Sequence, residues 1–182
     1  MPERLEIRVL GPLAVERGGS AVPLRGPKQR ALLGILLLRA GEVVPTEVLI
    51  EMLWGDSPPP TARTTIQVYI SKLRKLLSGT SGLRIETRGP GYAAQVDPGS
   101  LDLQRFEHLV ETGKEALAAG DAMRARELLA EALALWRGAP LEDVDLPADF
   151  AADLTRLEEE RLSALEARLE ADLALGRHAE IV

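Results

Sequence analysis

The 182-residue chain is long enough for two domains of roughly 80 to 100 residues each, and its 46% hydrophobic and 27% charged residues exclude a disordered protein. It has no cysteine and only two histidines, which excludes disulfides and thiolate chemistry, and it has no apolar run of membrane-spanning length. The net charge of −6 is uneven, because residues 1–97 carry 13 basic and 9 acidic side chains whereas residues 98–182 carry 9 and 19. We therefore expect a cytoplasmic protein with no metal or cofactor, whose two halves meet different partners.

The first half of the chain predicts a small sheet, three helices and a hairpin. Short alternating stretches separated by glycine turns over residues 5–24 indicate a small antiparallel sheet. Helices are predicted over residues 27–38, 46–54 and 62–77. Residues 83–87 and 92–96 alternate around the turn Arg88-Gly89-Pro90-Gly91, which predicts a β-hairpin with a rigid, basic tip. This α+β order is typical of a winged helix-turn-helix domain over residues 1–97.

The second half, residues 98–182, is predicted to be all helical. Apolar residues at helical spacing indicate two helices that meet at the Gly120-Asp121 turn, the second ending at Trp136, and a long helix over residues 150–175 follows a proline- and aspartate-rich break. The sequence from Leu173 to Arg177 repeats the pattern of residues 117–121, which predicts helical hairpins of the tetratricopeptide type. We expect the chain to be a fragment, because it stops at Val182 where the next return helix should begin.

The predicted helix over residues 62–77 has the features of a DNA-reading helix. Its apolar stripe consists of Ile66, Tyr69, Ile70, Leu73, Leu76 and Leu77. The opposite face carries short hydrogen-bonding side chains, an exposed valine and several cations, which suit the edges of bases and the phosphates of a major groove. The residues on this face are Thr64, Gln67, Val68, Ser71 and Lys75, flanked by Thr65, Lys72 and Arg74. An ordinary amphipathic surface helix is the alternative interpretation.

Two further residues are candidates for DNA contacts. Arg88 at the hairpin tip is placed to enter a minor groove beside the reading helix, although arginines at such tips are often only solubilising. Trp54 ends the second predicted helix, where its indole N–H can donate to a phosphate, although a core position is the alternative. No constellation of acid, base and nucleophile is present, so we expect no enzyme activity.

The segments Val48-Leu49-Ile50-Glu51-Met52-Leu53-Trp54-Gly55, residues 65–76, residues 88–92, residues 135–141 and residues 157–162 together resemble one family. That family is the Streptomyces antibiotic regulatory proteins, in which an OmpR-type winged helix precedes a bacterial transcriptional activation domain. The resemblance implies a transcriptional activator of specialised-metabolite genes that binds direct repeats in double-stranded DNA as a homodimer and contacts RNA polymerase. By position, the resemblance also implies a phosphate contact at Trp54, a wing contact at Arg88, and DNA-facing residues at Thr64, Thr65, Val68, Ser71, Lys72, Arg74 and Lys75.

The segment Asp56-Ser57-Pro58-Pro59-Pro60 is a candidate polymerase contact. It precedes the predicted reading helix and therefore projects beside the DNA, and its three prolines stiffen it. A simple spacer between two helices is the alternative. The acidic half cannot favour DNA, so we expect it to dock on protein, either the polymerase or the flank of the winged domain. A protein-interaction scaffold, in which the winged domain only docks protein, is the competing function.

Overall fold

The computed structural model describes residues 3–176, and its first layer is a four-stranded sheet in the order β3-β2-β1-β5. Its strands are β1 (Glu3–Arg8), β2 (Ala14–Arg17), β3 (Ser20–Ala21) and β5 (Thr80–Ser81). β1 pairs antiparallel with β2 but parallel with β5. The expectation of an antiparallel sheet confined to residues 5–24 was therefore incomplete, because two residues from beyond the third helix complete a mixed sheet.

Three helices pack between this sheet and the hairpin: α1 (Pro27–Leu38), α2 (Thr46–Trp54) and α3 (Ala62–Leu76). Every residue of α1 from Ala31 to Leu37 is buried, which explains why this helix is apolar on all sides. In α2 the buried residues are Thr46, Leu49 and Leu53. The Nζ of Lys28 donates to the carbonyl of Leu53 and so ties the start of α1 to the end of α2.

The wing is a three-stranded sheet in the order β4-β7-β6, made of β4 (Val44–Pro45), β6 (Leu83–Arg88) and β7 (Gly91–Val96). The hairpin was predicted, but β4 was not. Gly91 pairs with Pro45, and a Cβ at Gly91 would lie 2.1 Å from the carbonyl oxygen of Val44, so only glycine fits. The backbone N–H and the hydroxyl of Thr46 both donate to the carbonyl of Pro90, at 3.0 and 2.9 Å. The turn of the wing is thus braced against the start of α2.

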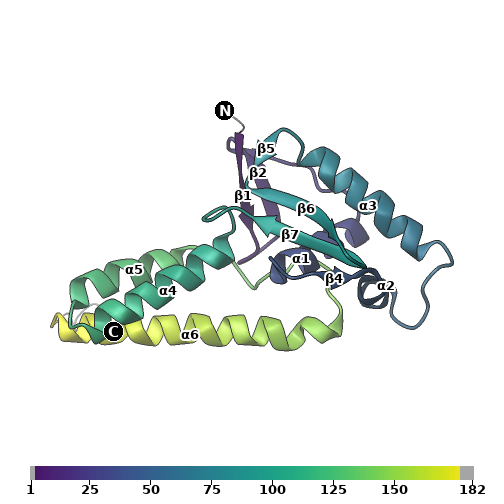
Figure 1. Ribbon diagram of the computed structural model, residues 1–182. Helices are drawn as coiled ribbons and strands as arrows, with labels where there is room; N and C mark the ends of the chain where they lie inside the picture. The colour runs from purple at the N-terminus through teal and green to yellow at the C-terminus, as the bar shows by residue number, and fades with distance from the viewer. Residues whose placement is uncertain (1–2, 177–182) are drawn as a thin grey trace.

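The second half consists of α4 (Asp102–Ala118), α5 (Ala122–Ala134), a short 3-10 turn at Ala148–Phe150 and α6 (Ala151–Ala174). α4 and α5 form the expected helical hairpin, and α6 runs along it (Figure 1). Trp136 lies beyond the end of α5. Its ring packs edge to face against the ring of Phe106, with 5.3 Å between the two ring centroids. Gly120 and Gly176 end their helices with positive φ angles of 82° and 73°, as the sequence repeat predicts. Arg177 and Val182 lie outside the described residues.

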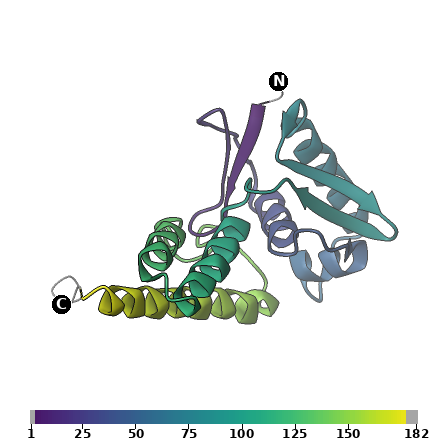
Figure 2. The same ribbon diagram turned by 60° about the vertical axis from the view of Figure 1, so that its left-hand side comes forward.

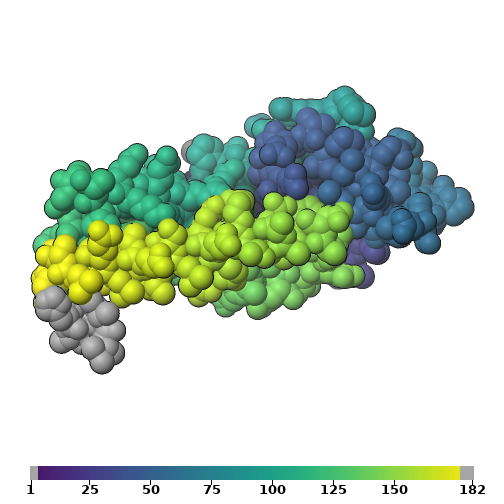
Figure 3. All heavy atoms as spheres, turned by 90° about the horizontal axis from the view of Figure 1, so that it is seen from below, coloured from purple at the N-terminus to yellow at the C-terminus, as the bar shows by residue number. Residues whose placement is uncertain are grey.

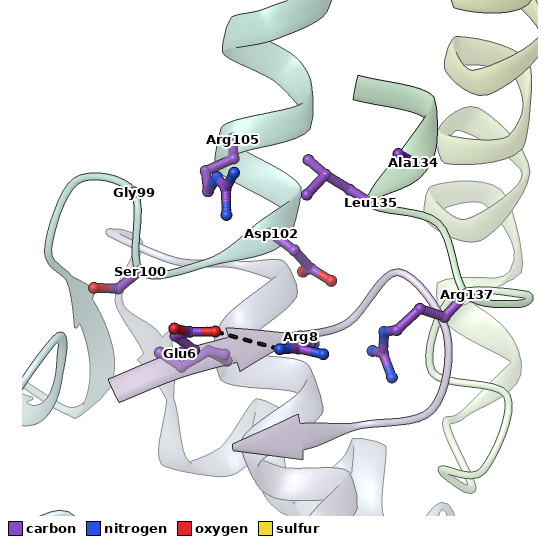
Figure 4. A pocket seen from close by; sticks show the side chains of 10 residues that line it. Glu6, Arg8, Gly99, Ser100, Asp102, Arg105, Ala134, Leu135 and Arg137 are labelled. Atoms are coloured by element: carbon purple, nitrogen blue, oxygen red, sulfur yellow. Dashed lines mark hydrogen bonds and ion pairs between the residues drawn. The ribbon is translucent and has the colours of Figure 1, made fainter. Parts of the chain in front are cut away.

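The two halves are joined by a buried seam rather than a linker. At the start of α4, the carboxylate of Asp102 accepts hydrogen bonds from the backbone N–H groups of Val9 and Leu10, at 2.8 and 3.1 Å. The backbone N–H of Arg137 donates to the carbonyl of Leu10, and its guanidinium donates to the carbonyl of Pro12. Figure 4 shows the side chains of Asp102 and Arg137 beside β1, which carries Glu6 and Arg8. Burial raises the pKa of Asp102 above its ordinary value, with these hydrogen bonds acting in the opposite direction. One continuous core therefore runs through both halves.

The segment between α5 and α6 extends this seam along the winged domain. Asp143 accepts from the backbone N–H of Leu13 at 2.7 Å and forms an ion pair with Arg30. At the start of α6, Asp153 pairs with Arg39 at 3.2 Å, and the Arg39 guanidinium lies 5.6 Å from the ring centre of Phe150. Figure 3 shows α6 passing from the helical half to the underside of the winged domain. The acidic half thus docks on the flank of the winged domain, one of the two expected partners.

No helix within residues 3–176 is long and apolar enough to cross a membrane.

Candidate nucleic-acid interface

α3 presents one buried and one exposed face, as its sequence predicts. Ile66, Ile70 and Leu73 are at most 2% exposed and anchor the helix in the core. Most of the predicted DNA-facing residues are exposed on the opposite side. Val68 is 44% exposed there although its side chain is apolar. The exposed set is Thr64, Gln67, Val68, Ser71, Lys72, Arg74 and Lys75, with Thr65 half-buried beside them. Two members of the predicted buried stripe, Tyr69 and Leu76, are only half-buried.

The exposed face of α3 is accessible because the helix lies on the side of the winged domain away from α4, α5 and α6 (Figures 1 and 2). An ion pair between Arg63 of α3 and Glu47 of α2 joins the two helices at their exposed surfaces. α3 is therefore anchored in the core on one face and open to solvent on the other. A helix needs this arrangement to enter a major groove, which is about 12 Å wide.

Arg74 points toward the wing. Its Nε donates to the carbonyl of Ile85 and its Nη2 donates to the hydroxyl of Thr87, both at 2.8 Å. Its guanidinium also lies 6.0 Å from the ring centre of Tyr92. These hydrogen bonds tie α3 to the hairpin, while the DNA contact expected of Arg74 stays a prediction. The tie could not be read from the sequence, since the acceptors lie on another element.

Arg88 lies at the exposed end of β6, where the prediction placed it. Its guanidinium pairs with Glu86, two residues earlier on the same strand, at 2.7 Å. Both side chains are well exposed, so water screens this ion pair and it contributes little to stability. A DNA phosphate or a narrow minor groove would have to compete with Glu86 for the guanidinium.

Trp54 and the segment that follows it differ in exposure. Trp54 is half-buried and packs against the core, which agrees with the alternative interpretation of a core position. In the candidate polymerase segment, Asp56, Ser57, Pro58 and Pro60 are exposed. Pro59 is half-buried, and its carbonyl accepts from the backbone N–H of Ala62 at 2.9 Å, which fixes the segment to the start of α3.

A basic groove beside α3 was missed by the sequence analysis. It has a volume of about 820 Å³ and lies between the start of α1, the β2–β3 region and the C-terminal half of α3. Its cations are Arg17, Arg25, Lys72 and Lys75, and no acidic residue lines it. Arg25 stands directly before the Gly26-Pro27 start of α1, so its position next to a helix N-terminus was the available signal. Within residues 3–176, no group of three or more metal-ligating side chains is present.

Comparisons with known proteins agree with this architecture. Residues 20–94 match the C-terminal domain of transcriptional regulatory proteins, and residues 101–182 match the bacterial transcriptional activator domain. The fold and the exposed basic helix thus define a transcriptional regulator in which a winged helix precedes an activator domain. The chain is 40% identical over 188 residues to the regulatory protein DnrI of Streptomyces peucetius, an alignment that covers 98% of this chain and 68% of DnrI. The chain therefore belongs to the Streptomyces antibiotic regulatory protein family.

Two other relatives are longer proteins. The regulatory protein AfsR of Streptomyces coelicolor is 42% identical over 98% of this chain, which corresponds to 18% of AfsR. The solved structure of EmbR from Mycobacterium tuberculosis in complex with a low affinity phosphopeptide superposes with a TM-score of 0.92 at 35% identity. It covers 98% of this chain and 48% of the EmbR chain. This chain therefore spans less than a fifth of AfsR and about half of EmbR.

Proposed function

We propose that this chain activates transcription by binding duplex DNA with α3 in the major groove. The observation that carries the proposal is the exposed face of α3, where threonine, serine and lysine side chains surround Val68. Val68 is 44% exposed among these polar and basic side chains, where its methyl groups can contact a thymine methyl in the groove. The acidic helical half, held on the flank away from α3, leaves this face open.

The proposed roles follow from the placement of each residue. Bases are read by Thr64, Thr65, Val68, Ser71, Lys72 and Lys75. Trp54, which is only partly buried, donates its indole N–H to a phosphate, and Arg88 contacts the minor groove next to the wing. Arg74 positions the wing beside α3 through its bonds to Ile85 and Thr87.

At the level of the cell, we propose that the protein acts in the cytoplasm on the nucleoid, without catalysing a reaction. Two molecules bind direct repeats near promoters of specialised-metabolite genes, and the complex recruits RNA polymerase. Residues 1–97 supply the DNA-binding unit, and residues 98–182 supply the activation unit.

Selection of bound sequences from a random duplex pool tests DNA reading. We expect a recurrent direct-repeat motif from the unaltered chain. Val68→Ala and Lys72→Ala should each relax the preference at particular positions, by about 1 to 3 kcal/mol for a lost base contact. Arg84→Gln is the matched control, because Arg84 is an exposed cation on β6 outside the proposed interface. A pool that stays random, or identical preferences in all four proteins, would contradict the proposal.

Replacement of residues 57–60 by Gly-Ser residues tests activation. The segment is exposed, apart from Pro59, so the replacement should leave the core intact. We expect unchanged operator affinity and lost transcription from a reconstituted promoter when the segment contacts polymerase. Retained binding with full transcription would show that the segment is only a spacer.

A second candidate function is protein docking by the helical half, with the winged domain as a docking module. It is favoured by exposed leucines on α6, where Leu162 and Leu173 are 59% and 52% exposed. The same selection experiment separates the two functions, since a docking module would select no DNA motif.

A further inference from the structure

The basic groove beside α3 concentrates the cations that the fold leaves unpaired. Among the Lys and Arg side chains of residues 3–176, only Arg25, Lys72, Lys75 and Arg84 make no hydrogen bond, ion pair or ring contact with the protein. Three of these four line this one groove. The fourth, Arg84, lies on β6. Since most surface cations here find a carboxylate or carbonyl partner, three unpaired cations around one concavity indicate an anionic ligand.

Two further features lie at the same groove. Arg17 lines it, and its Nη2 donates to the carbonyl of Leu76 at 2.6 Å, so the protein itself holds this positive charge in place. The 12-residue helix α1 also begins here, with no side-chain cap and no acidic residue in its first turn. Its N-terminal N–H groups and its dipole therefore favour negative charge at this place.

The floor of the groove is apolar. Pro23, Leu76 and the ring of Tyr69 line it together with the aliphatic parts of the basic side chains. This explains why Tyr69 and Leu76 are only half-buried although they belong to the apolar stripe of α3. A volume of about 820 Å³ lies within the range of small-molecule pockets, which combine an apolar lining with a few polar groups. A DNA phosphate would engage the cations but leave this apolar floor uncovered.

We propose that this groove binds a small organic anion with a flat apolar body, such as an aromatic carboxylate, sulfonate or phosphate. The body covers Tyr69 and Leu76, and the acidic group meets Lys72, Arg25 and the start of α1. Lys72 and Lys75 also belong to the proposed DNA-reading face, so a bound anion neutralises charge that DNA requires. This regulatory consequence rests on the proposed DNA-binding function, whereas binding of the anion itself does not.

Two fluorescent probes that differ by one acidic group test the proposal: anilinonaphthalene sulfonate and the uncharged phenylnaphthylamine. We expect the sulfonate to bind the intact chain with one-to-one stoichiometry, at least tenfold more tightly than the uncharged probe, and with an affinity that falls as salt rises. The double variant Arg25→Gln, Lys72→Gln should weaken the sulfonate about tenfold and leave the uncharged probe unchanged. Arg84→Gln is the matched control, because it removes the unpaired cation outside the groove.

The outcomes separate this proposal from the proposed function. Equal affinity for both probes, or a sulfonate affinity unchanged in the double variant, overturns the groove as an anion site. If the sulfonate shows no saturable binding but the double variant weakens a short duplex, the cations serve DNA phosphates alone and the proposal is wrong. If sulfonate and duplex bind together without competition, the regulatory part is wrong. A chain that binds sulfonate as expected but no duplex supports the groove and refutes the DNA function.

Discussion

Removal of the Arg74 side chain should release the wing from α3. The structure gives Arg74 two hydrogen bonds at 2.8 Å to β6 and a weak ring contact with Tyr92. At about 1 kcal/mol for each hydrogen bond from this surface guanidinium, Arg74→Ala should cost about 2 kcal/mol of unfolding free energy. With a urea dependence of about 2 kcal/mol per molar, the unfolding midpoint should fall by about 1 M.

Two companion variants separate wing positioning from a direct phosphate contact. Thr87→Val removes one acceptor and no charge, so it should reproduce about half of the stability loss. Arg74→Lys keeps the charge but cannot make both hydrogen bonds, so a phosphate contact would survive it and the tie to the wing would not.

The assays are urea unfolding followed by circular dichroism and duplex affinity measured across a salt series. We expect Arg74→Ala and Arg74→Lys to lower affinity for all sequences alike, with an unchanged slope of log affinity against log salt. The reasoning would be refuted if Arg74→Ala lowered that slope by about 0.9, the value for one phosphate contact, and left the urea midpoint unchanged.

Four further predictions concern the seam, the wing and the DNA. Because burial raises the pKa of Asp102, the folded protein holds this proton more tightly than the unfolded chain. The stability advantage of wild type over Asp102→Asn should therefore shrink as pH rises from the ordinary value of 3.8, and urea titrations in which it grows would contradict this. Gly91→Ala should lower the melting temperature more than Gly89→Ala, because a Cβ at Gly91 meets the backbone of Val44, whereas one at Gly89 meets open space and costs only the strain of a φ of 52°. Equal losses would show that β4 is dispensable. Arg88→Ala should weaken binding more on sites with A-tract flanks than on G·C flanks in titrations of both duplexes, and equal losses would reduce Arg88 to a phosphate contact. Insertion of about five base pairs between half-sites should abolish cooperative binding in gel-shift titrations and leave single-site affinity intact, and retained cooperativity would exclude contact between the two molecules.

Local patterns predicted the elements that local interactions determine. The apolar stripe of α3 and the glycine-rich turn of the wing can be read from adjacent residues, and both lie where they were expected. β4 and β5 were not predicted, because two-residue strands form only when a distant strand arrives beside them. Docking of the acidic half on the winged domain was expected, but the residues of the seam were not predicted, since the partners of Asp102 lie 92 and 93 positions earlier in the chain.

The candidate site shows the same division. Exposure on α3 followed from helical periodicity, which needs only the spacing of apolar residues. The role of Arg74 depends on two acceptors that lie on β6. The basic groove depends on Arg17 and Arg25, which precede α1 in the chain and line the groove together with residues of α3. Such contacts between distant segments leave no periodic pattern in the sequence. The sequence therefore shows that a residue is basic but not which groups its side chain contacts.

The contacts of Asp102, Asp143 and Asp153 hold the two halves of the molecule in one relative orientation, which a flexible linker would not do. When such a molecule is bound to a duplex through α3, its orientation on the DNA also determines where its helical half lies. B-DNA turns once in about 10.5 base pairs, so in the proposed complex each base pair added between an operator and a promoter rotates the whole helical half by about 34° around the duplex axis. A flexible linker would average over that rotation, whereas this seam transmits it in full. In the proposed complex, the spacing between binding site and promoter then sets the direction in which α6 points around the duplex.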